Sequence, residues 1–250
     1  MEGFLERFLH FLRARDSVRE QTEQFLLYRP DFVQKINAHL DLFVLLIRYI
    51  GNHQLIPLNA IPKENLNEFK NTYLWGIENY KEIYNELAGA IMLWFQGFYV
   101  HANRGLRTAF EMLLRYLYHV HINPLLKPDS ETIITPARYR QGLEHHPNFQ
   151  EYNSHYHFKE DLDLFYSKLS EIVHGANFNE LFEEAELFLP EKCQEFADNL
   201  VQFIQYHAIL LALVQPKMLQ ITPLDDFKAN DKKSGIFAKA EFVMQQIYSF

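Results

Sequence analysis

The chain has 250 residues, of which 48% are hydrophobic, and its 22 phenylalanines and 14 tyrosines supply unusually many aromatic side chains for a core. This composition argues against a disordered chain, because disordered chains combine low hydrophobicity with high net charge. The net charge of −8 also argues against extended binding to duplex DNA, which normally needs a basic face.

Cysteine use and the most apolar stretches bear on the cellular compartment. The single Cys193 excludes an internal disulfide and a thiolate metal cluster, and it fits a reducing cytoplasm. Glu2 and Glu6 interrupt the apolar N-terminus, which predicts an amphipathic helix and no secretory signal. The most apolar run, 208–214, is much shorter than the roughly 18 residues that a membrane span needs. We therefore expect a soluble cytoplasmic protein that does not cross a membrane.

The N-terminal segment is predicted to form three helices. Apolar residues from Phe4 to Leu12 recur at helical spacing, and Ser17 with Glu20 resembles a capping box that would start a second helix, ended by Pro30. Asp31 is the expected cap of a third helix, which Gly51 stops. Two prolines between 52 and 63 indicate a loop.

The remaining sequence predicts four long helices, because helical periodicity persists between well-placed Gly and Pro residues and no strand-like alternation is sustained. We expect an all-α fold with a four-helix-bundle core, an N-terminal helical extension and a C-terminal helix. The expected long helices cover 79–96, 99–121, 160–174 and 191–214, with a short helix at 137–145 and irregular chain at 147–158. The expected divisions are an N-terminal segment at 1–75, the bundle at 76–220, and a loop and helix at 221–250.

Two polar patterns lie within these apolar helices. Arg104, Arg107, Glu111 and Arg115 form a stripe at helical spacing, and Tyr166, Ser170 and His174 form another, with Lys168 a little to one side. Charged groups inside a bundle are costly unless paired, so we predict that Arg107 or Arg104 reaches the Tyr166–His174 line, with Glu111 compensating the charge. Solvated ion pairs and a histidine that caps its helix are the plainer interpretations.

These segments resemble the HEPN superfamily of helical bundles, in particular prokaryotic HEPN-like proteins of phage-defence and toxin–antitoxin systems. The resemblance rests on G-[FY]-x-x-x-A-x-x-x-L-R-x-x-[LF]-E at Gly97–Glu111 and on Y-x-x-L-S-x-x-x-H at Tyr166–His174. It covers about residues 79–215. Ribonucleases of that superfamily carry an R-x(4–6)-H motif, cleave RNA without a metal and usually pair their motifs across a dimer.

The resemblance implies roles for residues of both stripes. His174 is the expected general acid/base, Arg107 and Lys168 would stabilise phosphate charge, and Glu111 and Tyr166 would orient them. Lys168 stands where the motif has arginine, and lysine offers charge without a bidentate fork, which Arg107 could supply instead. The expected binding residues are Arg104, Arg115 and Ser170.

Cofactors are not expected. The sequence contains no P-loop, Rossmann glycine pattern, nucleophile elbow or H-E-x-x-H motif. His119 and His121 face different sides of a helix and are poor co-ligands. The loop histidines at 145–146 and 155–157 could gather a metal with Glu144 or Glu151, but they are expected to be solvent-exposed, and no metal site is predicted.

Two functions stay open from the sequence. The first is a HEPN-like component of a prokaryotic defence or toxin system that cleaves RNA without metal or binds it. The second is a non-catalytic structural or regulatory subunit, in which the same polar residues fix the register of the helices. Apolar faces near both termini also predict a homodimer or a place in a larger complex.

Overall fold

The computed structural model describes residues 4–52, 66–124, 126, 135–175 and 188–214. Every regular element in these ranges is a helix, so the predicted all-α fold class is confirmed. The elements are α1 Phe4–Leu27, α2 Pro30–Asn52, α3 Leu66–Phe95, α4 Tyr99–Leu117, a π-helical turn Tyr118–Ile122, α5 Pro136–Glu144, α6 Pro147–Tyr156, α7 Phe158–Gly175 and α9 Pro190–Val214. The predicted C-terminal helix and its loop lie outside the described residues.

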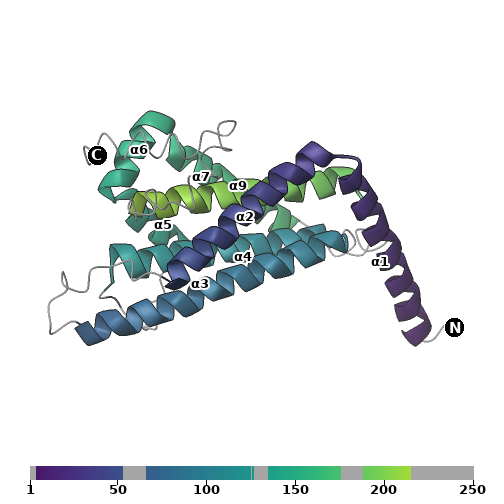
Figure 1. Ribbon diagram of the computed structural model, residues 1–250, viewed down its shortest axis with the longest axis horizontal. Helices are drawn as coiled ribbons and strands as arrows, with labels where there is room; N and C mark the ends of the chain where they lie inside the picture. Colours follow the sequence, from purple (N-terminus) through teal and green to yellow (C-terminus); the bar gives the residue numbers. More distant parts are fainter. Residues whose placement is uncertain (1–3, 53–65, 125, 127–134, 176–187, 215–250) are drawn as a thin grey trace.

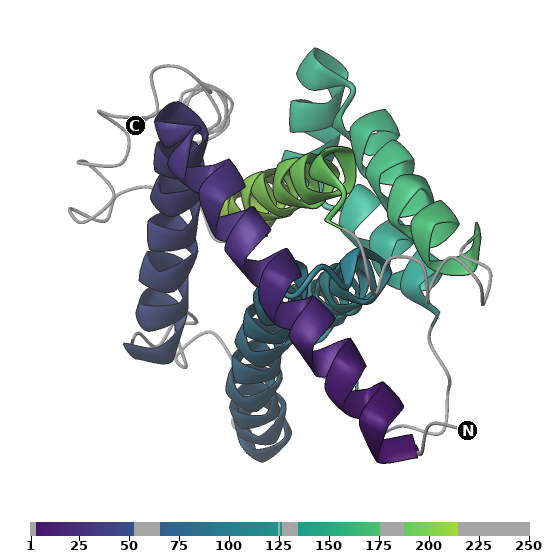
Figure 2. The same ribbon diagram turned by 90° about the vertical axis from the view of Figure 1, so that its right-hand side faces the viewer.

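Helix α4 lies at the centre of the fold. It packs along α3, its predecessor in the chain, and it also contacts α7 and α9. Helix α2 crosses the molecule and packs mainly on α9 (Figure 1). Figure 2 shows α9 between α2 on one side and the group α5–α7 on the other. The core therefore includes α2 from the N-terminal segment in addition to the four long helices that the sequence predicts.

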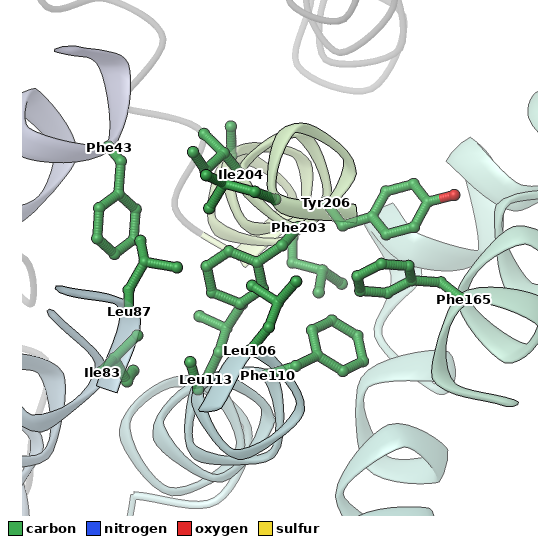
Figure 3. Close-up of a cluster of buried hydrophobic side chains, with 14 of the residues drawn as sticks. Phe43, Ile83, Leu87, Leu106, Phe110, Leu113, Phe165, Phe203, Ile204 and Tyr206 are labelled. Carbon is green, nitrogen blue, oxygen red and sulfur yellow. The ribbon is translucent and has the colours of Figure 1, made fainter. Parts of the chain in front are cut away.

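Aromatic and aliphatic side chains from five helices fill the centre (Figure 3). Phe110 on α4 is fully buried, and its ring meets Phe165 of α7 edge to face at 5.5 Å between centroids. Phe203 of α9 contacts Phe110 on one side and Phe43 of α2 on another. Burial of such rings is the main stabilising contribution here, on the order of 1.5–3 kcal/mol for each large side chain. This core joins α4 to α7 and so fixes the faces that carry the polar stripes.

Helix α1 packs against the turn between α3 and α4. Gly97 has φ +77°, and the amide of Phe98 donates to the carbonyl of Leu93 at 2.9 Å, which closes the C-terminus of α3. A Cβ at Gly97 would lie 2.5 Å from Val18 of α1, so only glycine allows this contact. Arg15 of α1 donates to the carbonyl of Gln96, and its guanidinium lies 4.4 Å from the Phe98 ring centroid.

Two predictions for the N-terminal region are wrong in detail. Helix α1 is continuous from Phe4 to Leu27, and Ser17 lies inside it, where its hydroxyl accepts from Gln21 at 3.1 Å. The capping-box pattern did not start a helix because no Gly or Pro interrupts the preceding helical sequence. Helix α3 begins at Leu66, 13 residues before the predicted Asn79, so the predicted boundary at residue 75 falls inside a helix.

The prediction of irregular chain at 147–158 is wrong, because α6 occupies most of this segment. Pro147 occupies the first turn of this helix, where its missing N–H costs nothing, and His157 ends it in the left-handed conformation with φ 51°. The many Asn, His and Tyr residues of the segment concealed a helix of nearly three turns. The predicted helix to His121 also changes character, because residues after Leu117 continue as a π-helical turn.

Helix α9 is the one described helix long and apolar enough to span a membrane by length and composition. Within its most apolar window, 78% of the residues are buried inside the fold, and Asn199 and His207 are among its buried polar side chains. A helix that is buried in the core of a fold can meet the same criteria of length and composition as a membrane span, so these criteria alone are weak evidence for one.

Candidate functional site

The two polar stripes meet where α4 packs on α7. Arg107 of α4 donates from Nη1 to Nε2 of His174 at 2.8 Å and from Nη2 to the Tyr166 hydroxyl at 3.3 Å. Its Nε donates to Oε1 of Glu111 at 3.0 Å. The prediction that Arg107 reaches the Tyr166–His174 line, with Glu111 as the compensating charge, is confirmed. Arg107, Glu111, Tyr166 and His174 are called the Arg107 cluster below.

Tyr166 is the second hub of the Arg107 cluster. Its hydroxyl donates to Oε1 of Glu111 at 2.7 Å while accepting from Arg107, so the three groups form a closed ring of hydrogen bonds. The guanidinium of Arg107 also lies 5.3 Å from the Tyr166 ring centroid. The guanidinium is therefore held by its ion pair with Glu111, by its hydrogen bonds and by the contact of its flat face with the Tyr166 ring.

A second arginine contacts the same tyrosine. Arg140 of α5 places its guanidinium 4.8 Å from the Tyr166 ring centroid and donates to Asp163 at 2.6 Å. Lys159 donates to the other oxygen of Asp163, also at 2.6 Å. The polar surface therefore extends from the end of α7 along α4 to α5.

The environment keeps these groups in fixed protonation states. Partial burial by itself would lower the pKa of Arg107, but the contacts with Tyr166 and Glu111 outweigh it and raise that pKa. Desolvation and the bond to Glu111 raise the pKa of Tyr166, although Arg107 opposes this effect. At neutral pH the guanidinium is therefore charged, and the phenol keeps the proton that it donates to Glu111.

The contact with Arg107 defines the state of His174. Because a guanidinium can only donate, Nε2 of His174 accepts, and the imidazole in this geometry is neutral with its proton on Nδ1. His174 is exposed at the last turn of α7, whereas the Arg107 side chain is 21% exposed and that of Glu111 30%. A neutral imidazole at the surface beside a fixed cation is suited to accept a proton from a ligand bound there.

Four other predicted site residues lie outside the Arg107 cluster. Arg104 is exposed and lines a groove between α3 and α4. Arg115 places its guanidinium 5.0 Å from the Trp75 ring centroid and bonds Tyr139. Lys168 forms an ion pair with Glu195 of α9 at 3.7 Å.

Ser170 is the fourth of these residues. It lies on α7 one turn before His174, and its hydroxyl is buried without a hydrogen-bond partner in the described part of the chain. The two sequence stripes are therefore divided among several surfaces, because successive turns of α4 and α7 face different neighbours.

Arg140, Asp163 and Lys159 were not anticipated from the sequence. The spacing of Lys159 and Asp163, four residues apart at the start of α7, is a local signal for an ion pair. Arg140 has no comparable signal, because it lies 23 residues from Asp163 and reaches it only through the packing of α5.

Metal ligands do not gather in the described ranges, where no group of three His, Cys, Asp or Glu side chains is placed to hold an ion. His119 is buried against Trp75, Tyr118 and Tyr139, His155 pairs with Glu151, and Nδ1 of His145 donates to the carbonyl of Gln141. These three histidines thus have structural or surface contacts.

Comparison with known proteins adds no further guide, because no family model, curated protein or solved structure matches this chain. The functional argument therefore rests on the contacts of the Arg107 cluster.

Proposed function

We propose that this protein is a HEPN-like component of a prokaryotic defence or toxin system, and that it acts on RNA by metal-independent cleavage with Arg107 and His174 as the reacting centre. The observation that carries the proposal is the 2.8 Å contact between Arg107 Nη1 and His174 Nε2. It joins a phosphate-binding group and a proton acceptor from two helices at one partly exposed place, as metal-independent RNA cleavage requires.

In the proposed reaction, the N–H groups of Arg107 that have no partner in this cluster bind the phosphate. Its guanidinium has five N–H groups, of which three are used by Glu111, Tyr166 and His174, so one on each Nη remains for a phosphate oxygen. Binding of a phosphate would draw Nη1 away from His174 and release the Nε2 lone pair. His174 then takes the proton of the ribose 2′-hydroxyl, whose oxygen attacks the adjacent phosphorus.

The bond from phosphorus to the 5′ oxygen breaks in the same reaction, and the imidazolium returns its proton to that leaving oxygen. The products are a 2′,3′-cyclic phosphate and a 5′-hydroxyl end. Arg107 stabilises the charge that develops on the phosphate oxygens. Glu111 and Tyr166 act as positioning residues, because they hold the guanidinium without touching the substrate. Lys168, engaged with Glu195, has a smaller role than the motif implies.

The test is incubation of purified protein with total RNA in EDTA. Wild type should cleave RNA and leave 2′,3′-cyclic phosphate ends, whereas His174→Ala should lose about 10²–10⁴-fold in rate. His155→Ala is the matched control, because His155 is another exposed histidine whose ring contacts a charged side chain, here Glu151 at 3.2 Å. It should cleave as wild type does. RNA left intact by folded wild type, or equal cleavage by His174→Ala, would refute the proposal.

A second candidate is a non-catalytic structural or regulatory subunit. The observation in its favour is charge balance, since Arg107 is compensated by Glu111 and Arg140 by Asp163, so the site carries little excess positive charge for a phosphate. In that case the cluster fixes the register of α4 against α7. His174→Ala would then lower the melting temperature or weaken assembly with a partner, while wild type left RNA intact.

A further inference from the structure

A groove of about 600 Å³ between α3 and α4 carries two charged side chains that have no polar partner in the described ranges. One is Glu86 of α3, which is half-buried, and the other is Arg104 of α4, which is exposed. Arg107, Arg140 and Lys168 differ in this respect, since each of them pairs with a carboxylate. Glu86 and Arg104 line the same groove from opposite helices without pairing with each other, so both are available to a ligand.

Small residues line the groove where the two helices approach each other. Gly89 lies well inside α3, where glycine is less favourable than alanine, and a Cβ placed there would meet nothing within 4 Å. No packing contact in the described chain therefore accounts for this glycine. Gly105 of α4 and Ala90 of α3 also line the groove, and a Cβ at Gly105 would lie 3.0 Å from that of Ala90. These residues leave room for a flat ring against the helices, and the volume lies in the range of small-ligand sites.

A flat ligand of this groove must offer donors to Glu86 and acceptors to Arg104. A carboxylate accepts from two adjacent N–H groups, and a guanidinium donates in parallel to two adjacent acceptors. Guanine has both patterns, with N1–H beside N2–H on one edge and O6 beside N7 on the next. Adenine and cytosine place their amino donor beside an acceptor, and uracil places its single donor between two acceptors. Guanine is therefore the one RNA base that satisfies both side chains fully.

We propose that the α3–α4 groove binds a guanine base, with Glu86 accepting from N1 and N2 and Arg104 donating to O6 and N7. His101, whose ring meets that of Phe98 edge to face at 6.2 Å between centroids, provides an aromatic surface for the base in the same groove. Arg104 precedes Arg107 by one turn of α4, so the guanine is a base of a single-stranded RNA whose neighbouring phosphate lies at the Arg107 cluster. That choice of source rests on the proposed function, whereas a free guanine nucleotide presents the same base.

The first experiment measures nucleotide binding by isothermal titration calorimetry and needs no cleavage. Wild type should bind GMP about 10-fold or more tightly than AMP, CMP or UMP. Glu86→Gln replaces one acceptor by a donor, so it should weaken GMP binding about 10-fold and remove most of the preference over AMP. Glu82→Gln, on the exposed face of α3 one turn earlier, is the matched control and should bind GMP as wild type does. Gly89→Leu fills the groove and should abolish GMP binding, while the melting temperature stays unchanged or rises.

The second experiment distinguishes the two sources of guanine with 2′-O-methyl RNA tetramers, which cannot be cleaved. If the base belongs to RNA, UUGU should bind more tightly than both UUAU and GMP, whereas for a free nucleotide GMP binds at least as tightly as UUGU. Equal affinity for GMP and AMP, no binding of GMP and UUGU, or GMP binding unchanged in Glu86→Gln and Gly89→Leu would overturn the guanine site. Natural RNA left intact by a protein that binds GMP would contradict the proposed function alone, so the two ideas can fail separately.

Discussion

Two histidines of this protein contact a polar partner in opposite environments. His174 is exposed at the end of α7 and accepts a hydrogen bond from the charged Arg107. His207 is fully buried in α9, bonds the hydroxyl of Tyr80 on α3 and stacks on Phe203. The first has ligand access and a fixed cation beside it, whereas the second is enclosed by aromatic rings.

A polar contact between helices can therefore serve chemistry or stability, and the burial of its groups decides which. Desolvation lowers the pKa of His207 to about 3 and raises that of Tyr80, so both groups stay neutral. A neutral buried pair can join α3 to α9 but cannot exchange protons with a ligand. We therefore expect changes at the Arg107 cluster to alter activity, and changes at His207 and Tyr80 to alter stability.

The largest expected effect is at Arg107. Arg107→Lys keeps the charge but loses the three-way donation to Glu111, Tyr166 and His174, so RNA cleavage should fall about 10²–10³-fold. Arg138→Lys on the exposed face of α5 is the control and should leave the rate unchanged. Rate measurements on both variants check this, and equal rates for Arg107→Lys and wild type would remove Arg107 from the reacting centre.

Acid should lower stability in part through His207, one of the buried histidines whose pKa is lowered by desolvation. The folded-state pKa of His207 is about 3 against an ordinary value of 6.5, so between these values the unfolded chain binds a proton that the folded chain does not. Stability from this group is complete above pH 6.5 and falls as the pH decreases, by about 1.4 kcal/mol per pH unit down to pH 3. Denaturant titrations at several pH values measure the slope.

The double variant Tyr80→Phe/His207→Leu removes both polar groups of the buried pair together and so avoids leaving one unpaired. The slope of stability against pH should fall by one proton's contribution, about 1.4 kcal/mol per pH unit, in this variant. An unchanged slope in the double variant would show that His207 is not the group that titrates.

A smaller effect is expected at Tyr166. Tyr166→Phe keeps the ring that Arg107 and Arg140 face but removes the hydroxyl that links Arg107 to Glu111. The free energy of unfolding should fall by about 0.5–1.5 kcal/mol, and cleavage should fall less than in Arg107→Lys. Chemical denaturation and RNA cleavage measured on the same sample compare the two effects. A loss of activity as large as that of Arg107→Lys would make Tyr166 a participant in the reaction.

The smallest effect is expected at Lys168. Its ion pair with Glu195 joins side chains that are 44% and 29% exposed, so Lys168→Ala should change the free energy of unfolding by less than about 0.5 kcal/mol. Cleavage should stay within about threefold of wild type, since the lysine is turned toward α9. A much larger loss of activity would restore to Lys168 the phosphate role that the sequence motif implies.

Much of this architecture could be predicted because it depends on local patterns. Helical periodicity and the glycine at position 97 correctly indicated α4 and its start, and the four-residue spacing of Arg107 and Glu111 indicated their pairing. The meeting of Arg107 with His174 was also predictable, because unpaired charge inside a bundle is costly.

The remaining features depend on contacts between distant segments. Arg140 reaches Tyr166 only because α5 folds back beside α7, and the sequence has no periodic signal for that. The ion pair of Lys168 with Glu195 of α9 was not foreseen, because helical spacing gives the direction of a side chain but not the neighbouring helix. The His207–Tyr80 pair joins residues 127 positions apart in the chain, so it could be recognised only in the folded structure.

The most direct test of the central claim is a double-mutant cycle on RNA cleavage with Arg107→Ala, His174→Ala and the double variant. If the two residues form one reacting centre, their effects are not additive, and the double variant cleaves about as slowly as the slower single variant. If wild type leaves RNA intact, or if the two losses simply multiply, Arg107 and His174 do not act together on RNA, and the central claim is contradicted.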